Sequence, residues 1–198
     1  MSCRYALRSL GLCLCLSMLS GCASLLSSNE PAQPPREALT EFVLEGRFSL
    51  FHDGKNYSGR LDWTHREAGS ELLLSSPFGQ GLAEIVTDAG GARLTQSDGK
   101  TFVAPDVETL TQDVLGYPLP LGRMADWMRG QVPSGQGRLD SLGRVVLLEQ
   151  DAWRIDYEYA GQDPRSPPVR ITARRAGNFE LRVIVQAWHR LSSKEITP

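Results

Sequence analysis

The chain has no cysteine beyond position 22; its four cysteines are Cys3, Cys13, Cys15 and Cys22. A domain built from the later residues therefore has no disulfide, no thiolate metal site and no cysteine nucleophile, and its stability must come from a packed core. The sequence also lacks a G-x-S-x-G turn, an H-E-x-x-H helix and a glycine-rich phosphate loop. We therefore expect no enzymatic activity, no metal and no cofactor.

The chain also has no excess of positive charge. The chain has 21 basic and 23 acidic residues, which gives a formal net charge of −2. No stretch of basic residues with interleaved aromatics occurs, so nucleic acid is not an expected partner. No apolar run after the first segment approaches the length of a membrane-spanning helix.

Residues 1–21 are typical of a secretory signal peptide. Arg4 and Arg8 precede a short apolar run, Leu10–Leu19, which is too short to cross a bilayer core about 30 Å thick. The tetrapeptide Leu19-Ser20-Gly21-Cys22 then resembles the lipobox of bacterial lipoproteins, in which the leader is cut before a cysteine that becomes acylated. The alternative is an ordinary secretory signal with a chance cysteine.

Residues 22–38 comprise the lipidated Cys22 and a segment rich in Ser, Pro and Ala, which is typical of an extended tether. No aspartate follows the cysteine, and its absence favours the outer membrane over the inner one. Two or more acyl chains anchor a protein firmly. We therefore expect a signal peptide at 1–21, a lipidated tether at 22–38 and a single domain at 39–198.

Apolar and polar residues alternate in most of the remaining chain, which predicts a mainly β domain. Two helical patterns interrupt the strands, one running from Asp106 to Gly116 and one from Leu121 to Gly130. A large antiparallel sheet with one apolar face needs a cover, and two helices in mid-chain suit a lid. The expected strands are 42–51, 57–64, 71–75, 82–87, 92–96, 101–104, 153–159, 169–174 and 179–186.

Four tryptophans stand out among the apolar residues. Trp63 and Trp153 belong to the apolar faces of strands, and Trp127 belongs to the second helix. Trp188 shares its strand parity with polar residues such as Arg182, unless a bulge intervenes. These large side chains either pack a core or line a cavity for a lipid-like ligand, and the pattern alone leaves both open.

The tetrapeptide Ser76-Pro77-Phe78-Gly79 predicts a type I turn with a phenylalanine at its tip. Phe78 either folds back onto the sheet or projects as a membrane probe. Inserting one phenylalanine into hydrocarbon would contribute roughly 1.5–3 kcal/mol, enough to orient a protein that is already anchored.

Two stretches, ELLLSSPFGQGLAEI and LTQDVLGYPLPLGRMADWMRG, together with the four tryptophans, resemble the LolB family of outer-membrane lipoprotein receptors. The resemblance covers roughly residues 40–190. It implies an incomplete antiparallel β-barrel of about eleven strands, with a helical lid over an apolar cavity. It also implies a lipid-anchored monomer on the periplasmic face of the outer membrane.

The resemblance further implies partners and sites. A LolA-like periplasmic carrier would deliver outer-membrane lipoproteins as cargo, whose acyl chains enter the inner leaflet. The membrane-insertion loop would be Pro77, Phe78 and Gly79, with Phe78 where family members often carry leucine. The residues expected to line the acyl-chain cavity are Leu44, Phe48, Leu61, Trp63, Met124, Trp127, Trp153, Ile155 and Tyr157.

Two other functions remain open at this point. An enzyme acting on lipid or cell wall would need a cluster such as His65, Asp62 and a serine in one cleft. A structural lipoprotein of an outer-membrane assembly complex would present an exposed apolar patch instead of an enclosed cavity.

Overall fold

The computed structural model describes residues 33–132, 137–176 and 179–191. The predicted signal peptide at 1–21, Cys22 and most of the tether lie outside these residues. The helical elements are the 3-10 turn η1 (Arg36–Ala38), α2 (Val107–Leu115) and α3 (Leu121–Met128). The strands are β1 (Phe42–His52), β2 (Lys55–Arg66), β3 (Gly69–Ser75), β4 (Gly81–Asp88), β5 (Gly91–Gln96), β6 (Thr101–Ala104), β7 (Arg138–Leu139), β8 (Val145–Gln150), β9 (Trp153–Glu158), β10 (Arg170–Arg175) and β11 (Phe179–Arg190).

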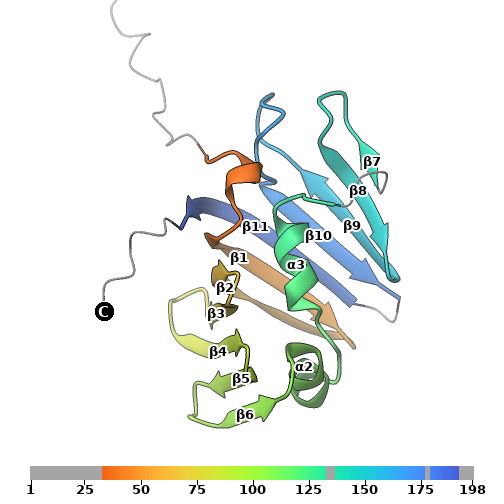
Figure 1. The fold of residues 1–198 in the computed structure, drawn as a ribbon. Coiled ribbons are helices and arrows are strands. Elements are labelled where there is room, and N and C mark those ends of the chain that lie inside the picture. Colours follow the sequence, from red (N-terminus) through yellow and green to blue (C-terminus); the bar gives the residue numbers. More distant parts are fainter. Residues whose placement is uncertain (1–32, 133–136, 177–178, 192–198) are drawn as a thin grey trace, which may run out of the picture. The chain divides into compact units, whose positions relative to one another are not determined.

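In the described part of the chain, one sheet of eleven strands has the order β6-β5-β4-β3-β2-β1-β11-β10-β9-β8-β7. Neighbouring strands are antiparallel, and β1 and β11 lie side by side in the middle (Figure 1). The edge strands β6 and β7 do not pair with each other within these residues, so the sheet stays open. The predicted incomplete antiparallel barrel is therefore confirmed.

The two helices cover one face of the sheet (Figure 1). The carboxylate of Asp106 accepts a hydrogen bond from the Thr109 amide at 2.7 Å and begins α2, and Gly116, at φ +74°, ends it. The predicted starts and ends of both helices agree with the structure to within two residues. No helix among the described residues combines the length and apolar character needed to cross a membrane.

A bulge between β1 and β11 explains the position of Trp188. Glu45 pairs with Ala187 but Gly46 pairs with Val185, so one residue of β11 is skipped and the parity of the strand changes. Trp188 is consequently buried, although its spacing from the earlier residues of β11 predicts exposure. A side chain at Gly46 would place its Cβ 2.6 Å from the carbonyl oxygen of Ile184, so the close approach here requires glycine.

The segment that leads from the tether is fastened to α3. The buried guanidinium of Arg129 donates hydrogen bonds to the carbonyl oxygens of Leu39, at 3.0 Å, and Ala125, at 3.1 Å. Gln131 donates its side-chain amide to the carbonyl of Arg36 at 3.0 Å. Residues from Gln33 onward form a compact unit of their own. A chain that begins at residue 23 therefore keeps the whole folded unit.

Replacing Arg129 with methionine should lower the free energy of unfolding by about 1–3 kcal/mol, because two buried carbonyl oxygens lose their donor. Urea denaturation of the chain that begins at residue 23 measures this change in the free energy of unfolding. Arg123→Met is the matched control, since it removes an arginine of the same helix whose ion pair with Asp151 is exposed. Its effect should stay below about 1 kcal/mol. Equal losses in the two variants would contradict a special role for Arg129.

Candidate functional site

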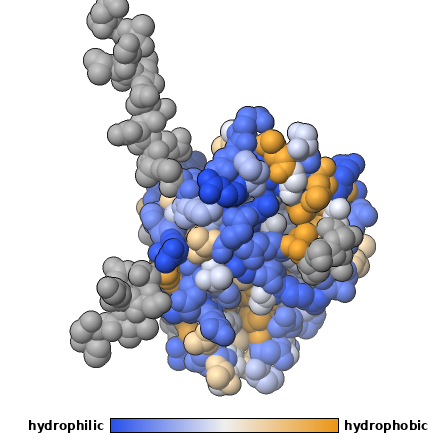
Figure 2. Space-filling model, turned by 45° about the horizontal axis from the view of Figure 1, so that its top comes forward, coloured by the Kyte–Doolittle hydropathy of each residue, from blue (hydrophilic) through white to orange (hydrophobic). Residues whose placement is uncertain are grey.

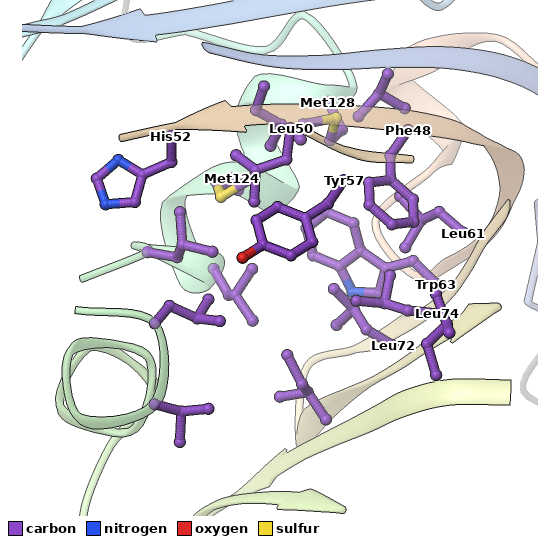
Figure 3. A pocket seen from close by; sticks show the side chains of 18 of the residues that line it. Phe48, Leu50, His52, Tyr57, Leu61, Trp63, Leu72, Leu74, Met124 and Met128 are labelled. Carbon is purple, nitrogen blue, oxygen red and sulfur yellow. The ribbon is translucent and has the colours of Figure 1, made fainter. Parts of the chain in front are cut away.

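A cavity of about 410 Å³ lies between one face of the sheet and the two helices (Figure 3). Its size falls within the range of roughly 300–1,000 Å³ that is usual for small-molecule sites. Most of its wall is apolar. The lining residues are Phe48, Leu50, His52, Asp53, Lys55, Tyr57, Leu61, Trp63, Leu72, Leu74, Leu82, Ile85, Val114, Leu115, Leu119, Leu121, Met124, Met128, Leu181 and Val183.

The period of the strands explains how so many apolar side chains meet. Leu61 and Trp63 of β2 are two residues apart, so both point to the same face of the sheet. Figure 3 shows these side chains on the strand side of the cavity and Met124 and Met128 of α3 on the helix side. The helix thus closes a space whose other walls are alternate residues of neighbouring strands.

The wall has a buried floor and an exposed mouth. Trp63 and Met128 in the floor are each 1% exposed. The mouth consists of Tyr57, Leu82 and Leu115, which are 51%, 42% and 42% exposed. These residues lie at the start of β2, the start of β4 and the end of α2. The cavity therefore opens at the end of the sheet that carries the β3–β4 turn.

Four of the residues expected to line the cavity lie in its wall. Phe48 and Leu61 come from neighbouring strands, Trp63 lies near the floor, and Met124 comes from α3. The Trp63 ring also packs edge-on against Phe42, with ring centroids 5.7 Å apart, which holds it in place.

The other five expected residues are buried in the core but do not line the cavity: Leu44, Trp127, Trp153, Ile155 and Tyr157. The rings of Trp127 on α3 and Trp153 on β9 are 5.6 Å apart, and the indole of Trp127 donates to the Gln150 side chain at 3.1 Å. Burial raises the pKa of Tyr157 far above its usual value, so its hydroxyl stays neutral. The contact between Trp127 and Trp153 thus joins α3 to β9 outside the wall of this cavity.

Two residues of β3 line the cavity although the sequence pattern did not predict this. Leu72, Leu73 and Leu74 form a continuous apolar run in which alternation gives no direction. In the structure, Leu72 and Leu74 line the cavity while Leu73 is 42% exposed on the other face. The strand register could have identified them, because Trp63 pairs with Leu72 and Leu61 with Leu74.

The β3–β4 turn presents Phe78 to solvent. The amide of Gly79 donates to the carbonyl of Ser76 at 2.9 Å, as in the predicted turn, and Gly79 has φ +87°. Phe78 is 95% exposed, so it does not fold back onto the sheet. The face drawn in Figure 2 is mostly hydrophilic, with hydrophobic residues in separate patches. An exposed side chain of this size in a loop is a candidate contact for an apolar partner.

The structure brings His65 next to a serine but leaves Asp62, the third residue of the enzymatic alternative, apart from them. The Nδ1 atom of His65 lies 2.8 Å from the Ser70 hydroxyl, and burial, together with the charge of Arg129, lowers the pKa of His65. Asp62 is exposed on the opposite face of β2, between the buried Leu61 and Trp63. Within the described ranges, no three His, Cys, Asp or Glu side chains are grouped so as to hold a metal ion.

The chain is similar in sequence to known proteins. Residues 40–188 match the family described as outer membrane lipoprotein LolB. The outer-membrane lipoprotein LolB of Dechloromonas aromatica is 37% identical, over 89% of this chain and 95% of the relative. That of Azoarcus sp. is 35% identical, over 90% and 93%.

Among solved structures, a LolA superfamily protein from Nitrosomonas europaea matches with a TM-score of 0.44 and 9% identity, over 79% of this chain and 90% of that one. The family match covers most of the chain, and two relatives above 30% identity span nearly all of it. The chain belongs to the LolB family of outer-membrane lipoproteins.

Proposed function

We propose that this protein is a receptor for lipoproteins. It accepts their acyl chains in its apolar cavity from a LolA-like periplasmic carrier and inserts them into the inner leaflet of the outer membrane. The observation that carries the proposal is an apolar cavity whose mouth lies at the same end of the sheet as the exposed Phe78. Leu82 of the mouth lies only four residues after Phe78 in the sequence.

Energetics favour such an enclosure for this cargo. Each methylene of an acyl chain costs about 0.8 kcal/mol when it is exposed to water, so the chains must pass between apolar environments. We assign the contact with the chains to Phe48, Leu61, Trp63 and Met124, and to the other apolar wall residues. The five expected residues outside the wall support it from the core.

The remaining parts of the proposal concern the anchor. Acylation of Cys22 and the tether after it would hold the domain near the membrane that receives the cargo. One copy carries both the cavity and Phe78, so we propose that a monomer is sufficient. No cofactor is required beyond the acyl chains of the anchor and of the cargo.

The cavity supports this function over a structural role in an outer-membrane assembly complex. A structural role calls for a broad exposed apolar patch. The most exposed large apolar side chains among the described residues are Phe78 and Val103, which belong to different hairpins.

Filling the cavity should prevent uptake. Leu74→Trp adds a large side chain to the wall, and each methylene that it excludes removes about 0.8 kcal/mol of binding. Excluding two or three should reduce transfer from the carrier about tenfold or more. The assay mixes the soluble form, beginning at residue 23, with carrier loaded with radiolabelled triacylated lipoprotein, and counts the label on each separated protein.

Leu73→Trp is the matched control for this experiment, because Leu73 is the neighbouring residue on the opposite face and is 42% exposed. It should accept label normally. Equal transfer to both variants would indicate that the acyl chains of the cargo bind outside this cavity. Label that stays on the carrier when the unsubstituted chain is folded would exclude the receptor function.

Phe78→Glu should leave uptake intact and slow release into membranes. Loss of a penetrating phenylalanine removes about 1.5–3 kcal/mol of membrane contact, so release should slow about tenfold or more. Transfer of label from the loaded receptor to phospholipid vesicles measures this step. Val103→Glu, at a 75% exposed site on β6, is the control and should release cargo normally. Unchanged release by Phe78→Glu would remove the loop from the mechanism.

A further inference from the structure

One side of the cavity mouth is polar. Among the wall residues, the ionisable ones are His52, Asp53, Lys55 and Tyr57, and they follow one another at the end of β1 and the start of β2. The floor, in contrast, is formed by leucine, methionine and tryptophan. A ligand with an apolar tail and a polar head would therefore place its tail against the floor and its head at the mouth.

The geometry of the β1–β2 hairpin places these groups at the mouth. β2 pairs with β3 only from Arg60 onward, so its first five residues continue beyond the end of β3. The turn before them is tight, with Asp53 at φ +47° and Gly54 at φ +75°, as in two-residue hairpin loops. The hairpin thus carries its polar end past the neighbouring strand.

Several polar groups at this place have no partner within the described part of the protein. Among the described residues, Lys55 makes no ion pair, whereas Lys100, in the matching Asp-Gly-Lys turn, pairs with Asp98 at 2.9 Å. The Tyr57 hydroxyl has no hydrogen-bond partner in the same set and points toward the side of the cavity where His52 lies (Figure 3). The Nδ1 atom of His52 is buried and also unpaired among the described residues. A buried polar atom without a partner is costly.

The charges at the mouth favour a neutral head over an anion. The Oδ2 atom of Asp53 lies 3.5 Å from the Nε2 atom of His52, and Asp53 and Lys55 line the same cavity, so the mouth carries side chains of both signs. Carbonyl oxygens accept hydrogen bonds from ammonium and hydroxyl groups without bringing a charge of their own.

We propose that His52, Lys55 and Tyr57 form a head-group subsite that binds the ester carbonyl oxygens of an acylated lipid while its tails fill the apolar wall. Lys55 and Tyr57 donate the hydrogen bonds at the open side, and His52 lies behind them. The subsite rests on the proposed function, because it orients the same acyl cargo. It goes further by giving the cavity a preference for ester-linked chains over bare hydrocarbon.

The test compares ligands that share one tail. Methyl palmitate, hexadecane and palmitate, each delivered from cyclodextrin, displace a polarity-sensitive fluorophore from the soluble form beginning at residue 23. The unsubstituted protein should bind the ester about tenfold more tightly than the hydrocarbon, as two added hydrogen bonds allow. The double variant Lys55→Gln and Tyr57→Phe should bind both with the affinity of the hydrocarbon. Both side chains are exposed, so the fold should be retained.

Lys100→Gln is the matched control, since it removes an exposed lysine from the equivalent turn outside the cavity wall, and it should keep the preference for the ester. Equal affinity of the unsubstituted protein for ester and hydrocarbon would overturn the subsite while leaving the receptor function in place. Tighter binding of palmitate than of its ester would also overturn it, in favour of an anionic head. Failure of all three ligands to bind would instead contradict the receptor function.

Discussion

The structure depends on a sheet that has one apolar face and does not close. A closed barrel buries its own interior, but here the edges β6 and β7 do not pair in the described part of the chain, so helices must cover the face. α2 and α3 have nine and eight residues and are therefore about 12–14 Å long. β2, with 12 residues, extends about 40 Å. Each helix is much shorter than the longest strands, and the cavity lies between the helices and the sheet.

The fastening of α3 at both ends determines which part of the lid can adapt. Before the helix, Tyr117 stacks on Phe179 with ring centroids 4.4 Å apart and lies beneath the guanidinium of Arg175. After the helix, Arg129 binds the carbonyl of Leu39. The cavity-facing side chains between these contacts include two methionines, which are unbranched and change conformation at little cost. Under the proposed function, acyl chains of different length would therefore be accommodated by side-chain movement while the backbone of α3 stays in place.

Sequence patterns predicted the elements better than the cavity. Apolar spacing, capping residues and turn residues depend only on neighbours along the chain. The long strands, both helices and the Phe78 turn could therefore be located from the sequence. Whether an inward residue meets empty space or another side chain depends on distant contacts. Trp153 is buried as expected but packs against Trp127 of α3, and only the strand register brings Leu72 and Leu74 into the wall. The bulge opposite Gly46 reverses the parity that Trp188 would otherwise have.

The apolar wall and the mouth have different consequences for the proposed transfer of acyl chains. Burial of hydrocarbon is non-directional and scales with area, so the floor would hold any acyl chain of suitable size whatever protein is attached to that chain. Such a wall would set the affinity for acyl chains but would not determine when they are released. Release becomes favourable only when the chains can leave the cavity without meeting water, which requires the mouth to touch the bilayer. Phe78 and Leu82 lie four residues apart at one end of the sheet, so the proposed burial of Phe78 in a membrane would bring Leu82, and the mouth with it, to the membrane surface.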